Sequence, residues 1–251
     1  MSDPTDHLDR TDHSEDHPAA EEPLTRPGPD PAAGEWAAVD AYLESTVIRP
    51  DEDAVQVQQN AEAAGLPRIE VSSGQGKLLG LLAEISGARR VLEVGTLGGF
   101  STLWMARAVG EAGRVVSCEY EPSHAETARS SLDAAGVGAR VEIRVGAAAQ
   151  TLAGLIEEAP EPFDLVFLDA DKASNARYLE LALQMSRSGT VIVGDNVVRA
   201  GSVLGEGSDD PDVQGIRRFL AAQGEDPRLE ATAVQTVGAK GWDGFSLAVV
   251  R

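Results

Sequence analysis

Short apolar strands alternate with helical stretches through the middle of this chain, and the alternation restricts the possible folds more than any other feature. Five runs have the length and apolar character of buried strands: Arg90–Val94, Arg114–Glu119, Arg140–Val145, Phe163–Leu168 and Thr190–Val193. Helical patterns lie between them, near residues 99–109, 123–135, 147–158 and 173–186. Repeats of this kind predict an α/β protein with a parallel sheet that is covered by helices on both faces.

Both ends of the chain extend this pattern. Before the first strand, apolar spacing and stop signals predict three helices, around Trp36–Val47, over Asp51–Ala64 and over Gly74–Ile85. After a helix near 212–222, strands Leu229–Val237 and Phe245–Val250 are joined by a short glycine-rich connection. Such a connection requires an antiparallel pair. We therefore expect a mostly parallel sheet with an antiparallel last strand, unlike the all-parallel dinucleotide-binding fold.

The negative charge of the chain is concentrated near its N-terminus. Residues 1–35 hold ten acidic and two basic side chains and so carry −8 of the total formal charge of −20. This stretch is rich in proline and poor in large apolar residues, so it cannot bury enough surface to offset the entropy of ordering. We predict a disordered acidic tail over residues 1–34 and one folded domain over residues 35–251.

The composition also argues against several classes of function. An acidic surface is repelled by phosphate backbones, so nucleic acid is not an expected partner. The sequence has no apolar run long enough for a membrane span and no secretory signal, so a cytoplasmic location is expected. The single cysteine, Cys118, excludes a disulfide framework, and no P-loop or G-x-S-x-G elbow is present.

A glycine-rich turn follows the first predicted strand. Gly95 begins this turn, Glu93 precedes it, and Glu119 ends the second strand. Glycines let the backbone approach a ligand closely, and a carboxylate at the end of the second strand can accept both hydroxyls of a ribose. The pattern therefore favours an adenosine-containing cofactor. The spacing is not G-x-G-x-x-G, which counts against a nicotinamide cofactor, and a tight turn without a ligand is the alternative.

Acidic and amide side chains follow the fourth and fifth predicted strands. Asp169 ends one strand, and Asp195 and Asn196 end the next. The carboxyl ends of neighbouring strands meet at one edge of a sheet, and oxygen ligands without Cys or His suit a hard cation such as Mg²⁺. The alternative is that these residues cap helices. Near a cation, Lys172 could serve as a general base; its alternative is a surface lysine paired with Asp171.

Taken together, these motifs resemble a known family. The segments VLEVGTLGGFSTLWMARA, FDLVFLDADK and GDNVV, in this order and spacing, resemble the cation-dependent O-methyltransferases of the catechol and caffeoyl-CoA type, most closely the bacterial members. The resemblance runs from about Glu35 to Arg251 and includes the closing VGAKGWDGFSLAVV segment. It implies a Rossmann-like class I S-adenosylmethionine (SAM) methyltransferase fold with seven strands, and homodimers are common among such proteins.

The resemblance also implies roles for individual residues. It assigns Asp169, Asp195 and Asn196 to Mg²⁺ or another divalent cation such as Mn²⁺ or Ca²⁺, and Lys172 with Asp169 to catalysis. Cofactor contacts are implied for Val71, Glu93, Gly95, Thr96, Ser101, Glu119, Ala148, Asp169 and Asp171. In the loop that holds Ala148, the chain lacks the polar side chains that some relatives carry, so backbone groups would have to serve there.

We therefore expect an enzyme that transfers a methyl group from SAM to a hydroxyl of a small phenolic substrate, with a divalent cation. A metal-independent methyltransferase is the nearest alternative, in which Asp195 and Asn196 are structural only. A nicotinamide-dependent oxidoreductase and a non-catalytic interaction protein are further alternatives. Sensitivity to EDTA separates the first two, and binding of S-adenosylhomocysteine (SAH) against NAD separates the oxidoreductase.

Overall fold

The computed structural model describes residue 1, residues 33–158 and residues 161–251. The predicted tail falls almost entirely on residues 2–32, outside the described residues. The strands are β1 (Arg90–Val94), β2 (Arg114–Glu119), β3 (Val141–Val145), β4 (Phe163–Leu168), β5 (Ser186–Asp195), β6 (Leu229–Gly238) and β7 (Gly241–Val250). The α-helices are α1 (Ala33–Leu43), α2 (Glu52–Ala63), α3 (Ser73–Ile85), α4 (Phe100–Ala108), α5 (Pro122–Ala134), α6 (Ala148–Glu157), α7 (Asn175–Leu183) and α8 (Pro211–Glu225).

The seven strands form one sheet in the order β3-β2-β1-β4-β5-β7-β6. The pairs β3–β2, β2–β1, β1–β4 and β4–β5 are parallel, whereas β7 is antiparallel to both β5 and β6. The predicted mostly parallel sheet with an antiparallel last strand is therefore confirmed. The chain reverses its direction of winding between β1 and β4, and ligands in sheets of this kind bind at the carboxyl ends of the strands at such a point.

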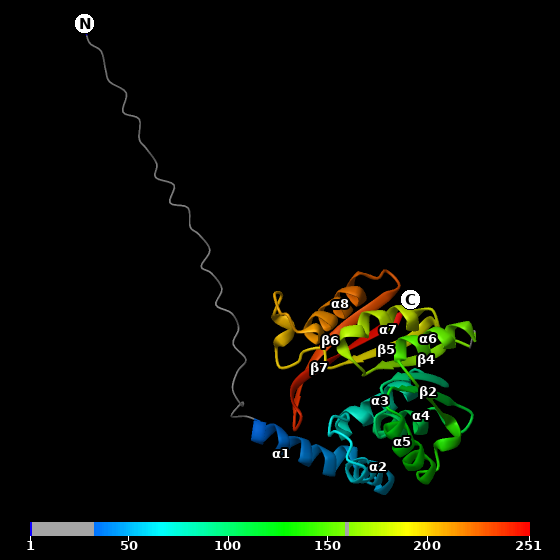
Figure 1. Cartoon of the computed structure of the whole chain (residues 1–251). Helices are drawn as coiled ribbons and strands as arrows, with labels where there is room; N and C mark the ends of the chain where they lie inside the picture. The colour runs from blue at the N-terminus through cyan, green and yellow to red at the C-terminus, as the bar shows by residue number, and fades with distance from the viewer. Residues whose placement is uncertain (2–32, 159–160) are drawn as a thin grey trace.

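Two apolar cores lie on opposite faces of the sheet, and Figure 1 shows the helices that cover both faces. Neighbouring residues of one strand enter different cores: Val91 packs with α3 and α4, while Leu92 packs with residues of α6 and α7. This alternation follows from the two-residue period of a strand. Every residue of β4 is buried, as expected for a strand at the centre of a sheet covered on both faces.

Several boundaries differ from the sequence prediction. The predicted strand over Thr190–Val193 extends over all of β5, and the predicted helix over 173–186 is divided into a 3₁₀ turn, Lys172–Ser174, and α7. The glycine-rich segment predicted to connect the last two strands is mostly strand, because β6 and β7 pair up to Gly238 and Gly241 and leave a two-residue turn. The pairing of their backbone groups thus outweighs the low strand propensity of glycine.

The first helix was predicted from the spacing of its apolar residues, and several of these residues are exposed. Val39 and Tyr42 on α1 are 56% and 65% exposed, and Val47 in the π-helical turn Glu44–Ile48 is 70% exposed. Figure 1 shows α1 beside the β6–β7 hairpin rather than against the sheet. Spacing alone therefore identified the helix but not its neighbours. In the described part of the chain, no helix combines the length and apolar character that a membrane span requires.

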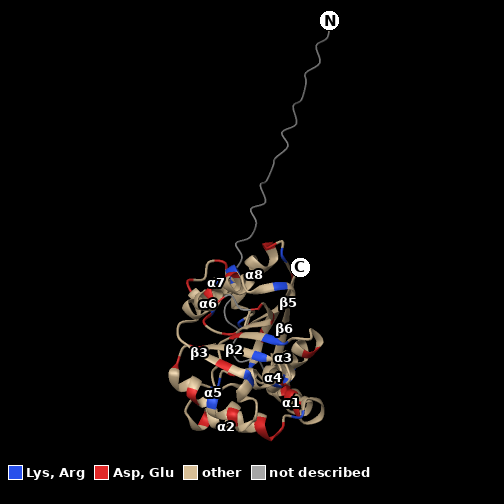
Figure 2. Cartoon of the chain, turned by 90° about the vertical axis from the view of Figure 1, so that its right-hand side faces the viewer, with Lys and Arg blue, Asp and Glu red and all other residues tan. Residues whose placement is uncertain are grey.

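Acidic positions are also spread over the folded part of the chain. Figure 2 shows them on α2 and α5. Since residues 1–35 account for −8 of the charge of −20, residues 36–251 carry the remaining −12. The four residues Glu93, Glu119, Asp169 and Asp195 differ from the surface acids because they lie at the carboxyl ends of β1, β2, β4 and β5.

Candidate active site

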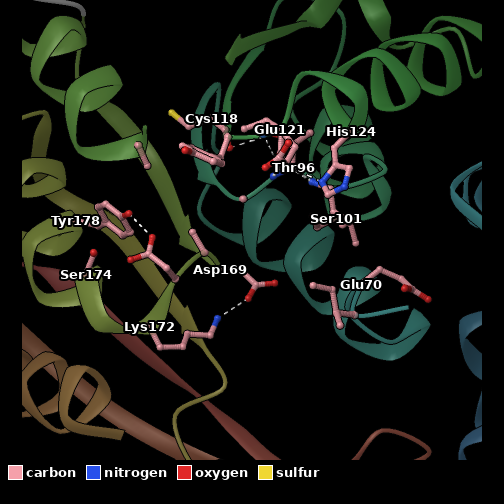
Figure 3. A pocket seen from close by; sticks show the side chains of 18 of the residues that line it. Glu70, Thr96, Ser101, Cys118, Glu121, His124, Asp169, Lys172, Ser174 and Tyr178 are labelled. Atoms are coloured by element: carbon pink, nitrogen blue, oxygen red, sulfur yellow. Dashed lines mark hydrogen bonds and ion pairs between the residues drawn. The ribbon is translucent and has the colours of Figure 1, made fainter. Parts of the chain in front are cut away.

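A cavity of about 840 Å³ opens at the carboxyl edge of the sheet. Figure 3 shows Lys172, Asp169 and Tyr178 on one side of it and Thr96, Ser101 and His124 on the other. The structure brings most of the predicted site residues into its lining: Val71, Gly95, Thr96, Ser101, Glu119, Ala148, Asp169, Asp171, Lys172 and Asn196. Glu93 lies behind this lining, and Asp195 lines a neighbouring cavity.

The turn after β1 is packed against the turn after β4. Gly95 has φ +105°, a region that favours glycine, and an added Cβ atom would lie 2.1 Å from the carbonyl oxygen of Asp169. The Asp169 amide donates to the carbonyl of Val94 at 2.8 Å. The backbone therefore fixes the position of Asp169 relative to the glycine-rich turn, and Gly95 is required for that contact.

The Gly95→Ala substitution is expected to lower the free energy of unfolding by about 1–3 kcal/mol from backbone strain, in addition to displacing the turn that holds Asp169. Gly154→Ala in α6 is the matched control, because an added Cβ atom there meets nothing within 4 Å. Alanine within a helix is favoured over glycine by about 0.5–1 kcal/mol, so this variant should be slightly more stable. Urea unfolding measures both, and equal stability of the two variants would contradict the prediction.

Glu119 is held by the backbone of the turn that it faces. Its Oε2 accepts hydrogen bonds from the amides of Thr96 and Leu97, at 3.1 and 2.8 Å, and its Oε1 accepts one from Glu121 at 2.9 Å. His124 Nδ1 lies 3.5 Å from the same Oε1. Because a carboxylate has about four acceptor sites, Glu119 can accept further hydrogen bonds from hydroxyls in the cavity.

Glu93 is fully buried and is surrounded by hydroxyl donors. Ser101 and Thr102 donate to its two oxygens at 2.5 Å each, and Ser117 donates at 2.6 Å. Burial raises the pKa of Glu93 from 4.5 to about 7, although these three hydrogen bonds act in the opposite direction. Ser101 lines the cavity, so it connects Glu93 to the ligand space. Direct contact between Glu93 and the cofactor stays a prediction.

The buried carboxyl of Glu93 also predicts a pH dependence of stability. Because its pKa is higher in the folded protein (about 7) than its ordinary value (4.5), the folded state holds more protons between these pH values. The free energy of unfolding should therefore fall as pH rises through this window. Glu93→Gln removes this titration. Relative to that variant, the wild type should lose up to about 3 kcal/mol between pH 4.5 and 8 in urea unfolding. A difference that does not change with pH would refute this.

Two carboxylates and an amide converge beyond β4 and β5. Lys172, whose side chain is 8% exposed, donates to Asp169 Oδ1 at 2.7 Å. Asp195 is 3% exposed, and burial together with the charge of Asp169 raises its pKa to about 7. Asn196 follows in a left-handed conformation, φ 57°, which is uncommon outside glycine and is enriched at functional sites. Lys172 is thus buried and paired with Asp169, so the alternative of a surface pair with Asp171 is wrong.

The donor set of this cluster fits a hard divalent cation. Two repelling carboxylates in a buried place are stabilised by positive charge, and carboxylate and amide oxygens are the ligands that Mg²⁺ prefers. In the described residues, no group of three or more His, Cys, Asp or Glu side chains is placed to hold a metal ion, so a site with three protein ligands here would have to include the side-chain amide of Asn196. Neither Asp169 nor Asp195 caps a helix, since the next caps are Asp171 and Gly201.

Other residues of the site were not identified from the sequence. Tyr178 donates a hydrogen bond to Asp171, and burial raises the pKa of its hydroxyl to about 12. Gln75 in α3 donates to Asp195. The Gln75 contact joins segments that are 120 residues apart and depends on the complete fold, whereas Tyr178 lies only seven residues after Asp171. No local motif marks either residue. His124 falls in the helix predicted near residues 123–135, but its position in the cavity lining was not predicted.

A second cavity, of about 800 Å³, adjoins the first. The two share Ile69, Glu70, Val71 and Asn196 in their linings. The second cavity is bounded by the start of α3, by Asp195 and by the tip of the β6–β7 hairpin. At that tip, Lys240 donates to the carbonyl of Glu70. The cluster of Asp169, Lys172, Asp195 and Asn196 therefore lies where two cavities meet.

The family model for O-methyltransferases matches residues 49–249. The catechol O-methyltransferase of Mycobacterium tuberculosis is 56% identical over 213 residues, which cover 85% of this chain and 95% of that protein. The catechol O-methyltransferase of Niastella koreensis is 47% identical over 217 residues, with coverage of 86% and 98%.

Solved structures show the same architecture. The O-methyltransferase of Bacillus cereus in complex with SAH has 51% identity and a TM-score of 0.86, covering 87% of this chain and 100% of that one. An O-methyltransferase of tomaymycin synthesis from Streptomyces achromogenes, in complex with SAM, has 45% identity and a TM-score of 0.84, with coverage of 87% and 98%. SAH and SAM both contain adenosine, as the glycine-rich turn and Glu119 predict, and they agree with the cofactor that the family resemblance implies. This chain therefore belongs to the O-methyltransferase family and is a SAM-dependent O-methyltransferase.

Proposed function

We propose that the enzyme methylates one hydroxyl of a small vicinal phenol in a reaction that depends on a divalent cation. The cluster of Asp169, Lys172, Asp195 and Asn196 at the junction of the two cavities is the observation that carries this proposal. It combines oxygen ligands for a cation with a buried lysine. The names of the two curated relatives, both catechol O-methyltransferases, support the same acceptor class.

The first cavity suits the cofactor. Glu119 would accept hydrogen bonds from the ribose hydroxyls, since its carboxylate is already fixed by the amides of Thr96 and Leu97. Gly95 and the turn after it would allow close approach of the backbone, and Ser101 would present a hydroxyl that Glu93 orients. Asp171 is fixed by Tyr178 on the opposite side. These carboxylates together favour a ligand that carries positive charge.

The second cavity suits the methyl acceptor. It contains Asp195, shares Asn196 with the cofactor cavity and includes the apolar side chains Leu78, Val237 and Phe245. Asp169, Asp195 and Asn196 would hold the cation, which when bound supplies a Lewis acid that fixes two adjacent phenolic oxygens and lowers the pKa of one hydroxyl. A vicinal phenol presents two such oxygens on a flat apolar ring, so its shape and chemistry match both features.

Lys172 would act as the base. Its Nζ would take the proton of the hydroxyl that is to be methylated, while Asp169 keeps the side chain in position. The acceptor oxygen then forms its bond to the methyl carbon as the bond from that carbon to the sulfonium sulfur breaks, leaving SAH. The fold contributes mainly alignment of oxygen, carbon and sulfur, because the two cavities approach each other at Asn196.

A methyl-transfer screen tests this function. Catechols and matched monophenols are incubated with SAM and the full chain, with Mg²⁺ or with excess EDTA. We expect methylation of the vicinal phenols in the presence of Mg²⁺ and little or none in excess EDTA. Transfer that persists fully in EDTA would instead favour a metal-independent methyltransferase, and methylation of monophenols at the same rate would refute the acceptor class.

Homodimer formation and a cytoplasmic location stay predictions. Light scattering during size-exclusion chromatography tests the first.

A further inference from the structure

We infer that Gln75 is a positioning residue that orients Asp195 toward the cation. The inference rests on the proposed cation dependence. Gln75 Nε2 donates to Asp195 Oδ1 at 2.6 Å, which joins the start of α3 to the end of β5 across 120 residues of sequence. In the proposed reaction Asp195 holds the cation, and Gln75 has no direct part. Its contact is nonetheless one of the shorter hydrogen bonds of the site.

The backbone of Gln75 is fixed independently of Asp195. The side chain of Ser72, the N-cap residue of α3, accepts a hydrogen bond from the backbone N–H of Gln75 at 3.2 Å. Gly76, the next residue, packs so closely on Trp104 that an added Cβ atom would lie 2.5 Å from the indole ring. The side chain of Gln75 therefore starts from a rigid point, and a rigid donor can hold a carboxylate in one orientation.

The hydrogen bonds of Asp195 are distributed unequally between its two oxygens. Oδ1 accepts a hydrogen bond from the side-chain amide of Gln75 and, at 2.8 Å, one from the backbone N–H of Asn196. Among the hydrogen bonds of the described residues, none reaches Oδ2. A carboxylate held through one oxygen presents the other to a ligand, so this arrangement leaves Oδ2 for the cation.

The amide of Gln75 suits this task better than a charged donor would. An ammonium group in its place would repel a divalent cation, whereas a neutral amide orients the carboxylate without that cost. Asp195 is 3% exposed, so bulk water does not replace the hydrogen bond that is lost with the Gln75 donor. Removing a residue that orients a metal ligand weakens metal affinity by about 10- to 100-fold in characterised sites.

The test compares Gln75→Met with the wild type. Gln59→Met on α2 is the matched control, because Gln59 is exposed and lies outside both cavities. Binding of Mn²⁺ to the metal-free full chain is measured by electron paramagnetic resonance, and binding of SAH by calorimetry. For Gln75→Met we expect the Mn²⁺ Kd to rise by about 10- to 100-fold. The Kd for SAH should stay within about twofold of the wild type, since Gln75 is not among the residues that line the first cavity.

Activity gives a second readout. Excess Mg²⁺ should restore kcat of Gln75→Met, since the variant weakens cation binding but leaves Lys172 in place. If Gln75→Met does not fold, Gln75→Asn serves instead: it keeps the amide but is one methylene too short to reach Asp195. An unchanged Mn²⁺ Kd in a folded variant overturns the role of Gln75 alone. Absence of Mn²⁺ binding to the wild type overturns the proposed cation dependence and this inference with it.

Discussion

Replacing Asp169 with Asn is expected to lower kcat/KM for a vicinal phenol in Mg²⁺ by about 10³-fold or more. The substitution keeps the shape of the side chain but removes a negative charge that interacts with Lys172 and with Asp195. Lys172 donates to Asp169 Oδ1 at 2.7 Å, and the same carboxylate acts on Asp195 by its charge. Stabilisation of a developing phenolate by a bound cation is worth several kcal/mol. Each 1.36 kcal/mol changes a rate about tenfold, so loss of a cation ligand reaches this range.

The Asp169→Asn variant is assayed beside Asp133→Asn, which removes an acidic side chain from the exposed face of α5. Both substitutions change the net charge by the same amount. Initial rates are measured over a range of Mg²⁺ concentrations, and thermal unfolding shows whether each variant is folded. We expect Asp133→Asn to match the wild type. Near wild-type turnover of folded Asp169→Asn, especially in excess EDTA, would show that this carboxylate does not hold a cation that the reaction needs.

Much of the fold could be predicted because the strands are marked locally. Arg90–Val94, Arg114–Glu119 and Phe163–Leu168 were predicted with the bounds that β1, β2 and β4 have. Central strands of a parallel sheet are apolar on both faces, so their sequences are continuous apolar runs that polar turns interrupt. The antiparallel β7 could also be predicted, because a short connection between strands permits only one direction.

Features that depend on distant contacts could not be predicted from local patterns. The apolar spacing of α1 predicted a helix, but nothing in it shows that Val39 and Tyr42 would be exposed. The hairpin tip illustrates the same point. Ala239 in the two-residue turn donates to Asp40 of α1 at 2.7 Å, a contact across 199 residues. Glycine content predicted a connection over residues 238–244 because it reports local backbone freedom, whereas the pairing of β6 with β7 leaves only a two-residue turn.

Some residues of the candidate site could likewise be predicted from local patterns, and others could not. Residues at strand ends, such as Asp169 and Asp195, could be predicted because the carboxyl ends of parallel strands meet at one edge. The partner of Lys172 could not be predicted, since Asp169 and Asp171 are both near it in sequence, and the structure pairs it with the first. Gln75 lies 120 residues from Asp195, so no spacing rule connects the two.

Replacing Lys172 with Met should lower kcat by about 10²- to 10⁴-fold, the usual contribution of a positioned base. Methionine keeps a long side chain in a place where the lysine is 8% exposed, so the variant should fold. Unlike Asp169→Asn, this variant retains every proposed cation ligand. The affinities for Mn²⁺ and SAH should therefore stay close to those of the wild type, and excess Mg²⁺ should not restore the rate. The loss should fall on kcat rather than on the KM for SAM.

The pH profile distinguishes a base from a residue that only positions Asp169. If Lys172 takes the hydroxyl proton, higher pH should partly restore the rate of Lys172→Met, because the phenol then ionises without help. Lys172→Arg is the informative companion: it keeps a positive charge beside Asp169, but a guanidinium does not lose its proton near neutral pH. An active Lys172→Arg with an unchanged pH profile would mean that the charge of Lys172, rather than its basicity, is what the reaction requires.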